Sequence, residues 1–237
     1  MNKVIQLIIK EQNPQEHFRQ EGLNIYIGKT PEHLLQLEEF HSCLSTEEKA
    51  RADKFKFPEL KDTYVACHGK LRHLLSEKTG EEAGKIQIDT GKFGKPELAE
   101  HPLHFNISHS KDVFAIAISE ETEIGIDVEV INPDFTYSGI IQSWFHPNEI
   151  KAIEAETERT SQLQKFYTFW TRKEAFLKAI GIGLINELQS IDTSCSNRNT
   201  PCDSLKAMFS GKKESKVAIQ NWSVEDAVVS YAQFGEK

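Results

Sequence analysis

The sequence predicts an α+β protein built from two similar halves that pack face to face. Three observations lead to this fold class. Apolar residues recur at helical spacing in two long segments, 62–78 and 164–184. Short segments rich in Val, Ile and Phe are bounded by turn residues, as is typical of β-strands. A faint internal repeat relates the first part of the chain to the second.

The expected elements follow the same order in both parts of the chain. Segment 44–55 opens with Ser45, Thr46 and an acidic first turn, which is a helix-start signal. Further helices are expected at 62–78, 145–153 and 164–184. Strands are expected at 3–9, 23–27, 104–110, 113–118, 125–131, 216–220 and 227–233. Residues 192–204 are polar and predict a loop.

The repeat rests on two glutamate–glycine pairs. In each half a glutamate precedes a glycine by 32 residues. The two pairs are Glu48–Gly80 and Glu149–Gly181. Aligning HGKLRHLL (68–75) with WTRKEAFL (170–177) places Arg72 opposite Glu174. We therefore expect one basic and one acidic wall at a site between the halves.

Composition limits the function classes. The chain has 237 residues with 38% hydrophobic and 27% charged residues, enough for one large domain or two small ones. A formal net charge of -8 argues against a nucleic-acid partner, but it permits a local basic pocket for one phosphorylated ligand. The apolar run in MNKVIQLIIKEQ is too short for a signal peptide or a membrane span, so a cytoplasmic protein without membrane contact is expected.

Four cysteines show no metal-binding or disulfide spacing. Cys43, Cys67, Cys195 and Cys202 form no paired CxxC motif, and free thiols are the expected state. A zinc site at Cys195 and Cys202 would lack two further ligands.

The stretch GIDVEV (125–130) places two carboxylates in an apolar strand. Residues two apart share one face of a strand, so Asp127 and Glu129 are expected to point the same way. Like charges this close disfavour each other's ionisation unless a positive charge lies between them. The pattern therefore predicts a cation beside this strand.

A third carboxylate is expected from the helix in segment 164–184. Glu174 and Lys178 are four residues apart, at the edge of an apolar stripe that includes Trp170. Such a pair can be a surface ion pair of little energetic value. Beside an acidic strand, Glu174 can instead complete an all-oxygen shell of the kind that suits magnesium.

Two further segments carry candidate ligand-binding residues. GKFGKP (91–96) presents Lys95, either on a surface turn or in a phosphate-binding loop, although the segment is no Walker A motif. NISHS (106–110) places Ser108 and His109 at a strand end, where His109 can also be a structural histidine.

Taken in order, GKP, FNISHS, GIDVE, FHPNE and FWTRKEAFLKAIGIGL resemble the 4'-phosphopantetheinyl transferases of the surfactin-synthetase type. The resemblance covers residues 44–184, and the combined spacing of the motifs makes it specific. It implies a pseudo-dimer in which each half is a small antiparallel sheet with a long helix packed on it and the active site lies between them. Residues 1–120 would form the half that contributes to coenzyme A binding, and residues 121–237 the half with the metal site.

The resemblance also implies an activity and its partners. The family transfers the phosphopantetheine arm of coenzyme A to a serine of an apo carrier protein, releases 3',5'-ADP and needs Mg2+. The carrier would be an acyl or peptidyl carrier of fatty-acid, polyketide or nonribosomal-peptide synthesis, including antibiotic synthesis. Because one chain would already enclose the site, a monomer is expected.

Motif positions assign roles to ten residues by resemblance. The metal ligands would be Asp127, Glu129 and Glu174. The coenzyme A contacts would be Arg51 at the 3'-phosphate, Lys95, Ser108, His109, and Lys173 and Lys178 near the pyrophosphate. The catalytic residues would be Glu174, Lys178 and Glu149. At one position the chain departs from the family pattern, because members often carry a further basic residue where this chain has Glu48.

The chemistry leaves some alternatives open. Positive charge from Mg2+ and Lys178 would stabilise the negative charge that builds up on the phosphate oxygens. The base that removes the serine proton would be Glu174, Glu149 or a hydroxide held by the metal. A silent binding module and a magnesium-dependent phosphodiesterase are rival classes. The apolar segment 131–145, which includes Phe135, Tyr137 and Ile141, is either a carrier-docking surface or part of the core.

Overall fold

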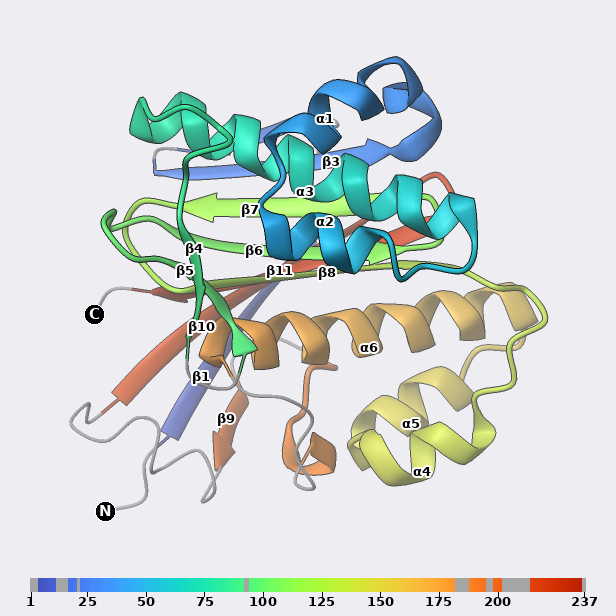
Figure 1. The fold of residues 1–237 in the computed structure, drawn as a ribbon. Helices are drawn as coiled ribbons and strands as arrows, with labels where there is room; N and C mark the ends of the chain where they lie inside the picture. Colours follow the sequence, from blue (N-terminus) through green and yellow to red (C-terminus); the bar gives the residue numbers. More distant parts are fainter. Residues whose placement is uncertain are drawn as a thin grey trace.

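The protein has four layers, with two β-sheets between two groups of helices (Figure 1). The structure, a computed structural model, describes residues 4–11, 17–20, 22–91, 94–181, 188–194, 198–201 and 214–235. Its four-stranded sheet has the order β2-β3-β7-β6, and its five-stranded sheet the order β8-β11-β10-β1-β9. Strand pairs in both sheets are antiparallel except β1 with β10, which are parallel. The predicted α+β fold with small, mainly antiparallel sheets and helices packed on them is confirmed.

The elements of the first half lead from β1 to β7. The strands are β1 (Val4–Glu11), β2 (His17–Gln20), β3 (Leu23–Lys29), β4 (Ile88–Thr90), β5 (Pro96–Leu98), β6 (His104–Ser110) and β7 (Val113–Ser119). The helices are η1 (Thr30–Gln36), α1 (Leu37–Cys43), α2 (Thr46–Ala52) and α3 (Pro58–Thr79). Although β1 comes first in the chain, it pairs within the five-stranded sheet of the second half.

The second half repeats this order. Its strands are β8 (Ile124–Val130), β9 (Arg198–Pro201), β10 (Glu214–Val224) and β11 (Ala227–Gly235). Its helices are α4 (Ser138–Trp144), α5 (Pro147–Glu154), α6 (Arg159–Ile180) and η3 (Leu188–Ser190). The pairs β3 and β8, α1 and α4, and α3 and α6 begin and end 101 residues apart. The faint repeat in the sequence therefore corresponds to a repeat of whole structural elements.

Local sequence signals explain where the helices begin and end. Helix α2 starts with a capping box in which Ser45 and Glu48 satisfy each other's backbone N–H groups. Both long helices, α3 and α6, end at a glycine with left-handed backbone geometry, Gly80 at φ 78° and Gly181 at φ 71°. The helices expected at 44–55, 62–78, 145–153 and 164–184 correspond to α2, α3, α5 and α6. Helices α1 and α4 were not predicted.

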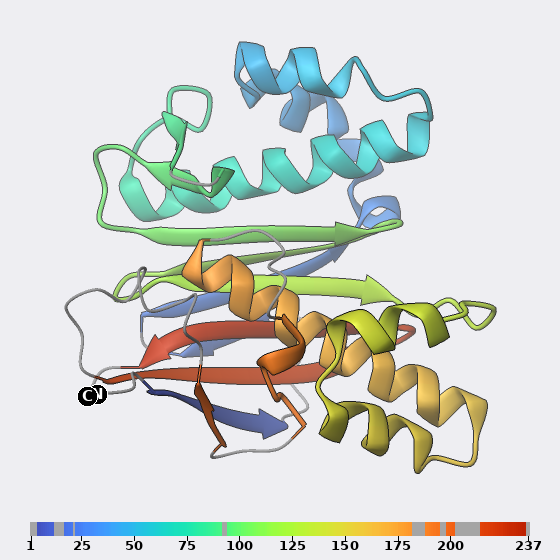
Figure 2. The same cartoon turned by 90° about the horizontal axis from the view of Figure 1, so that it is seen from below.

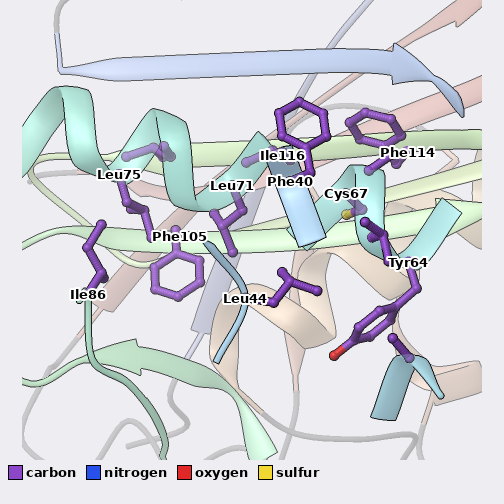
Figure 3. Packing of buried hydrophobic residues seen from close by; sticks show 14 of the residues in the cluster. Phe40, Leu44, Tyr64, Cys67, Leu71, Leu75, Ile86, Phe105, Phe114 and Ile116 are labelled. Carbon is purple, nitrogen blue, oxygen red and sulfur yellow. The ribbon is translucent and has the colours of Figure 1, made fainter. Parts of the chain in front are cut away.

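Three hydrophobic clusters hold the layers together. One joins α3 to the outer face of the four-stranded sheet; Figure 3 shows it, with Tyr64 at its border. A second lies between the inner faces of the two sheets, where β3 and β7 meet β8 and β11. A third packs α6 on the five-stranded sheet, and Figure 2 shows α6 lying obliquely over this sheet with α4 and α5 beside it. No helix within the described residues is both long and apolar enough to cross a lipid bilayer.

The cysteines are described only in part. Cys43 and Cys67 are free and buried, as expected of reduced thiols. Cys195 and Cys202 lie outside the described residues. The expected loop at 192–204 is wrong in one part, because Arg198–Pro201 forms strand β9 and pairs with β1.

Candidate active site

The two carboxylates of strand β8 lie on one face, as the strand period predicts. Asp127 is buried and Glu129 is half-buried. The residues between and beside them, Ile126, Val128 and Val130, point to the opposite face and pack in the cluster between the sheets. The apolar half of the strand thus holds the acidic half in place.

Strand β6 supplies hydrogen bonds to both carboxylates. Ser108 Oγ donates to Asp127 Oδ1 at 2.8 Å, and Ser110 Oγ donates to Glu129 Oε2 at 2.7 Å. The backbone of β8 is bound by the same strand, because the N–H of Ile126 donates to Asn106 Oδ1 at 2.9 Å. Sequence reasoning missed Asn106 and Ser110. The period-two spacing of Asn106, Ser108 and Ser110 is the signal that places them on one face.

Helix α6 brings Lys178 and Glu174 to the same place. Lys178 Nζ donates to Asp127 Oδ1 at 2.7 Å and to the carbonyl of Ile126 at 3.1 Å. The helix approaches this closely because residue 125 is glycine: a Cβ there would lie 2.1 Å from the carbonyl oxygen of Ala175. The cation expected beside strand β8 is thus Lys178 in this structure.

The electrostatics of this cluster show more negative than positive charge. Burial raises the pKa of Glu174 to about 7, and the charge of Asp127 adds to the shift. Burial also raises the pKa of Glu129, again with a contribution from Asp127. Asp127 Oδ2 is buried and has no hydrogen-bond partner. One lysine therefore does not balance three carboxylates.

The predicted magnesium site is not present as a closed set of ligands. Within the described residues, no group of three or more His, Cys, Asp or Glu side chains is arranged to hold a metal ion. The chemistry of the donors still fits a hard cation: the three groups are carboxylates, one oxygen of Asp127 is unpaired, and their charges repel one another. Magnesium binding here stays a prediction.

Cationic residues face the site from the first half. The guanidinium of Arg51 lies 5.6 Å from the ring centroid of Tyr64, and His68 stacks on the same ring at 4.0 Å. Desolvation lowers the pKa of His109, and the positive charges of His68, Lys178 and Arg51 lower it further. Arg51, His68 and His109 are therefore close enough to repel one another, although they come from α2, α3 and β6.

Lys95 is held by other groups of the protein. Its Nζ lies 2.5 Å from Glu123 Oε2 and donates to the carbonyls of Ile124 and Ala179 at 3.1 and 3.2 Å. Only 8% of the side chain is exposed. The lysine thus ties the loop before β5 to the end of α6 and the start of β8. A contact between Lys95 and a nucleotide stays a prediction.

Glu149 and Lys173 form a fully buried ion pair. Both side chains are 0% exposed, and Lys173 Nζ lies 3.0 Å from Glu149 Oε2. Lys173 also donates to the carbonyls of Leu188 and Ile191, and Glu149 accepts from Thr193. These contacts join α5, α6 and segment 188–193. The structure does not bring this pair into contact with the three carboxylates, and neither side chain has surface to offer a ligand.

The first half contains the counterpart of this pair, which corrects the expected register. Glu48 Oε2 accepts from Arg72 Nε at 2.7 Å, and Arg72 donates to the carbonyls of Ala83 and Ile86 at 2.9 and 3.0 Å. Arg72 lies 101 residues before Lys173, so it corresponds to Lys173 and not to Glu174. The carboxylate of Glu48, a departure from the family pattern, therefore has a structural partner.

The segment 131–145 packs in the core. Tyr137, Ile141 and Phe145 are 9%, 4% and 1% exposed, and the rings of Tyr137 and Phe145 stack on Phe166 of α6. Of the two interpretations of this segment, core packing accounts for these residues. Large exposed apolar side chains in the described chain lie elsewhere, at Leu34, Leu35, Phe57 and Leu60.

The fold and this arrangement define a class of protein: an α+β pseudo-dimer in which carboxylates and a lysine from one half adjoin cationic residues from the other. Comparisons with known proteins agree with it. Residues 123–232 match the model of the 4'-phosphopantetheinyl transferase superfamily, and residues 31–121 match that of the 4'-phosphopantetheinyl transferase N-terminal domain.

Individual relatives carry the same description. The 4'-phosphopantetheinyl transferase HetI of Nostoc is 36% identical over 161 residues, which cover 66% of this chain and 67% of HetI. The human L-aminoadipate-semialdehyde dehydrogenase-phosphopantetheinyl transferase is 30% identical over 77% of this chain and 64% of its own length. The 4'-phosphopantetheinyl transferase AcpT of Escherichia coli is 35% identical over 56% of this chain and 65% of AcpT. The chain belongs to the 4'-phosphopantetheinyl transferase superfamily.

The similarities cover part of the relatives' length, and one solved structure is similar at low sequence identity. The chain spans about two thirds of the length of the curated relatives it matches. A solved structure described as the ACPS-CoA complex of Chronobacterium ammoniagenes is 16% identical and gives a TM-score of 0.38, covering 48% of this chain and 97% of that one.

Proposed function

We propose that this protein transfers the 4'-phosphopantetheine group of coenzyme A to a serine of an apo carrier protein. The observation that carries this proposal is the convergence of Asp127, Glu129, Glu174 and Lys178 within a chain of this superfamily. The serine oxygen forms a bond to the β-phosphorus of coenzyme A. The bond from that phosphorus to the bridging oxygen breaks, and 3',5'-ADP leaves with the bridging oxygen.

The residues of the acidic cluster have separate roles in this proposal. Glu174 takes the proton of the serine, because burial and the charge of Asp127 raise the pKa of its carboxyl group and make it a stronger base than an exposed glutamate. Lys178 places a positive charge beside Asp127, where it can stabilise the phosphate oxygens as their charge grows. Asp127, Glu129 and Glu174 would hold Mg2+, which supplies additional positive charge to the two phosphates when bound.

The first half supplies the contacts to coenzyme A. Arg51 and His109 would bind phosphate groups of the nucleotide, and Ser108 positions Asp127 in addition to any contact with the ribose. Lys95 would have to exchange Glu123 for the nucleotide. Glu149 and Lys173 are proposed to be a structural pair, because both are fully buried.

We also propose where the chain divides, which type of transferase it is, its oligomeric state and its location in the cell. The division at residues 120 and 121, the surfactin-synthetase type, the monomeric state and the cytoplasmic location rest on sequence patterns. The partner is proposed to be an acyl or peptidyl carrier protein, and a panel of carriers from fatty-acid, polyketide and nonribosomal-peptide synthesis would identify the preferred one by kcat/KM.

The test measures the intact mass of apo carrier proteins after incubation with coenzyme A and MgCl2. Transfer adds one phosphopantetheine, about 340 Da, to the carrier. Hydrolysis of coenzyme A without a change in carrier mass would instead identify a phosphodiesterase, and binding without either reaction would identify a silent module.

Two variants of helix α6 and its N-terminal cap sharpen this test. Glu174→Gln should abolish turnover while coenzyme A binding changes by less than about tenfold, because the substitution keeps the size of the side chain and removes its charge. Glu158→Gln is the matched control: it is the same substitution at the N-cap of α6, on an exposed side chain that makes no capping bond. Near wild-type turnover of Glu174→Gln would contradict the assigned role.

A further inference from the structure

The ring of His68 on helix α3 is held by two contacts, one with an aromatic ring and one with a carboxylate. The ring is half-buried and stacks on Tyr64, one turn earlier on the helix, with centroids 4.0 Å apart. Its Nδ1 lies 3.2 Å from Glu48 Oε1. Two independent contacts therefore fix both the position and the rotation of this ring.

Glu48 is itself held rigidly. Its carboxylate caps helix α2 by accepting from the backbone N–H of Ser45 at 2.8 Å and accepts from Arg72, which is 2% exposed. These contacts and His68 lower the pKa of Glu48 to about 2 although burial opposes the shift. An ionised carboxylate can only accept hydrogen bonds, so His68 Nδ1 must be the donor. The ring atom left for a ligand is Nε2, which donates to a phosphate oxygen when the imidazole carries both ring protons.

The second half of the protein shows which of these contacts belong to the repeated framework and which are found in the first half alone. Both glutamates, Glu48 and Glu149, bind a cation of the following long helix that also donates to two backbone carbonyls. The other oxygen of Glu149 is taken by Thr193. The position 101 residues after His68 is Phe169, which is buried in the core. The contact between the glutamate and a histidine is therefore an addition made in the first half alone.

The groups around His68 are basic and would be stabilised by a bound anion. Arg51 lies over the same Tyr64 ring at 5.6 Å, and within the described chain its guanidinium has no carboxylate partner. His109 lies near both groups, as their effect on it shows. Three basic groups from three elements would repel one another unless a negative charge lies among them. Glu48 supplies one negative charge, but it is shared between Arg72 and His68, so positive charge remains in excess.

We propose that His68 is a further substrate-binding residue, held by Glu48 so that Nε2 contacts the terminal 3'-phosphate of coenzyme A together with Arg51. This assignment rests on the proposed function, in which Arg51 binds that phosphate. The Glu48 carboxylate holds one side of the imidazole, and the 3'-phosphate binds the other side. Glu48 thus acts as a positioning residue for His68.

The experiment compares coenzyme A with dephospho-coenzyme A, which lacks the 3'-phosphate. KM and kcat with an apo carrier are measured for the wild type and for His68→Gln. We expect His68→Gln to raise KM for coenzyme A about tenfold, the loss typical of one hydrogen bond to a charged group, while KM for dephospho-coenzyme A and kcat stay within about twofold. Glu48→Gln should shift KM in the same direction, because His68 loses its anchor.

His73→Gln is the matched control on the same helix. His73 also lies near a glutamate, with Nε2 3.8 Å from Glu39, but its ring packs edge-on against Phe40 of α1. This variant should leave the preference for coenzyme A over dephospho-coenzyme A unchanged. Melting temperatures of all variants establish that they are folded.

Each outcome decides the assignment. An unchanged preference in His68→Gln overturns it, and so does an equal rise in both KM values, which would reflect altered packing of α3. If the wild type modifies no carrier, the proposed transfer activity fails, and calorimetric Kd values of the two ligands for the wild type and His68→Gln then decide whether His68 binds the 3'-phosphate. A wild type that binds both ligands equally overturns the assignment.

Discussion

The two halves of this protein share a framework and differ where the chemistry lies. Both halves have a strand, two short helices and a long helix in the same order, and both long helices end at a left-handed glycine. The site of the second half contains Asp127, Glu174 and Lys178. The residues 101 positions earlier are, in the same order, a tyrosine, a histidine and a glutamate. These counterparts are Tyr26, His73 and Glu77. The framework is thus repeated, whereas the candidate site is not.

The packing of the long helices differs in the same way. In the second half Gly125 lets the backbone of α6 touch strand β8, which places Lys178 against Asp127. In the first half the corresponding residue is Asn24, and a cavity of about 210 Å³ lies between α3 and strands β3 and β7. Ile25, Leu74 and Ile116 are among the residues that line it. At this position, glycine accompanies a close contact between helix and strand in the second half, and asparagine accompanies a cavity in the first half.

The largest expected effect concerns the chemical difference between the halves. Asp127→Asn removes the charge that Lys178 pairs with, and we expect kcat to fall about a hundredfold or more. Its counterpart change, Tyr26→Phe, removes a hydrogen bond to His33 far along the chain from the acidic cluster and should alter kcat by less than about twofold. Carrier modification followed by mass spectrometry measures both. Equal losses in the two variants would mean that both halves take part in the reaction equally.

The next effect concerns the ion pair between Glu48 and Arg72 and the stability of the fold in acid. The pKa of Glu48 is about 2 in the folded state, below its ordinary value of 4.5, so its contribution to stability is present above pH 4.5 and is lost as the pH falls through 2. This contribution amounts to about 3 kcal/mol at neutral pH.

Glu48→Gln should therefore be less stable at pH 7 and lose less stability on acidification than the wild type. Urea unfolding between pH 7 and pH 3 measures both. Glu47→Gln, the same change at the preceding and exposed residue, is the control. Hydrogen bonds to the backbone and to Ser45 lower the pKa of Glu47 too, but water screens them, so this variant should stay closer to the wild type than Glu48→Gln. Parallel curves for Glu48→Gln and the wild type would show that the pair does not stabilise the fold.

The smallest effect concerns the contact between helix and strand. Gly125→Ala places a Cβ 2.1 Å from one backbone atom of α6 and 2.3 Å from another, so the helix must move, at a cost of about 2 kcal/mol in the free energy of unfolding. Asn24→Ala faces the cavity in the first half and should cost less than about 0.5 kcal/mol. Chemical denaturation measures both values. A neutral Gly125→Ala would show that the close contact is dispensable.

Sequence patterns predicted the local structure well wherever a physical period was strong. The alternation in GIDVEV placed Asp127 and Glu129 on one face, and the spacing from Glu174 to Lys178 placed both on one side of α6. Short helices such as α1 and α4 escaped prediction because one or two turns carry too little periodicity to stand out. The register of the repeat was misjudged by one residue, since the alignment of side-chain types favoured Glu174 over Lys173.

The sequence by itself determined the fold class, the family and the acidic strand, because these depend on local periods and on motifs in chain order. The tertiary structure decided which charges meet. Lys173 and Glu149 carry family motifs and yet lie fully buried against each other, whereas His68 carries no motif and lies beside Arg51 and His109. Pairing of charges depends on distances across elements that are far apart in the chain, and no local pattern of residues records those distances.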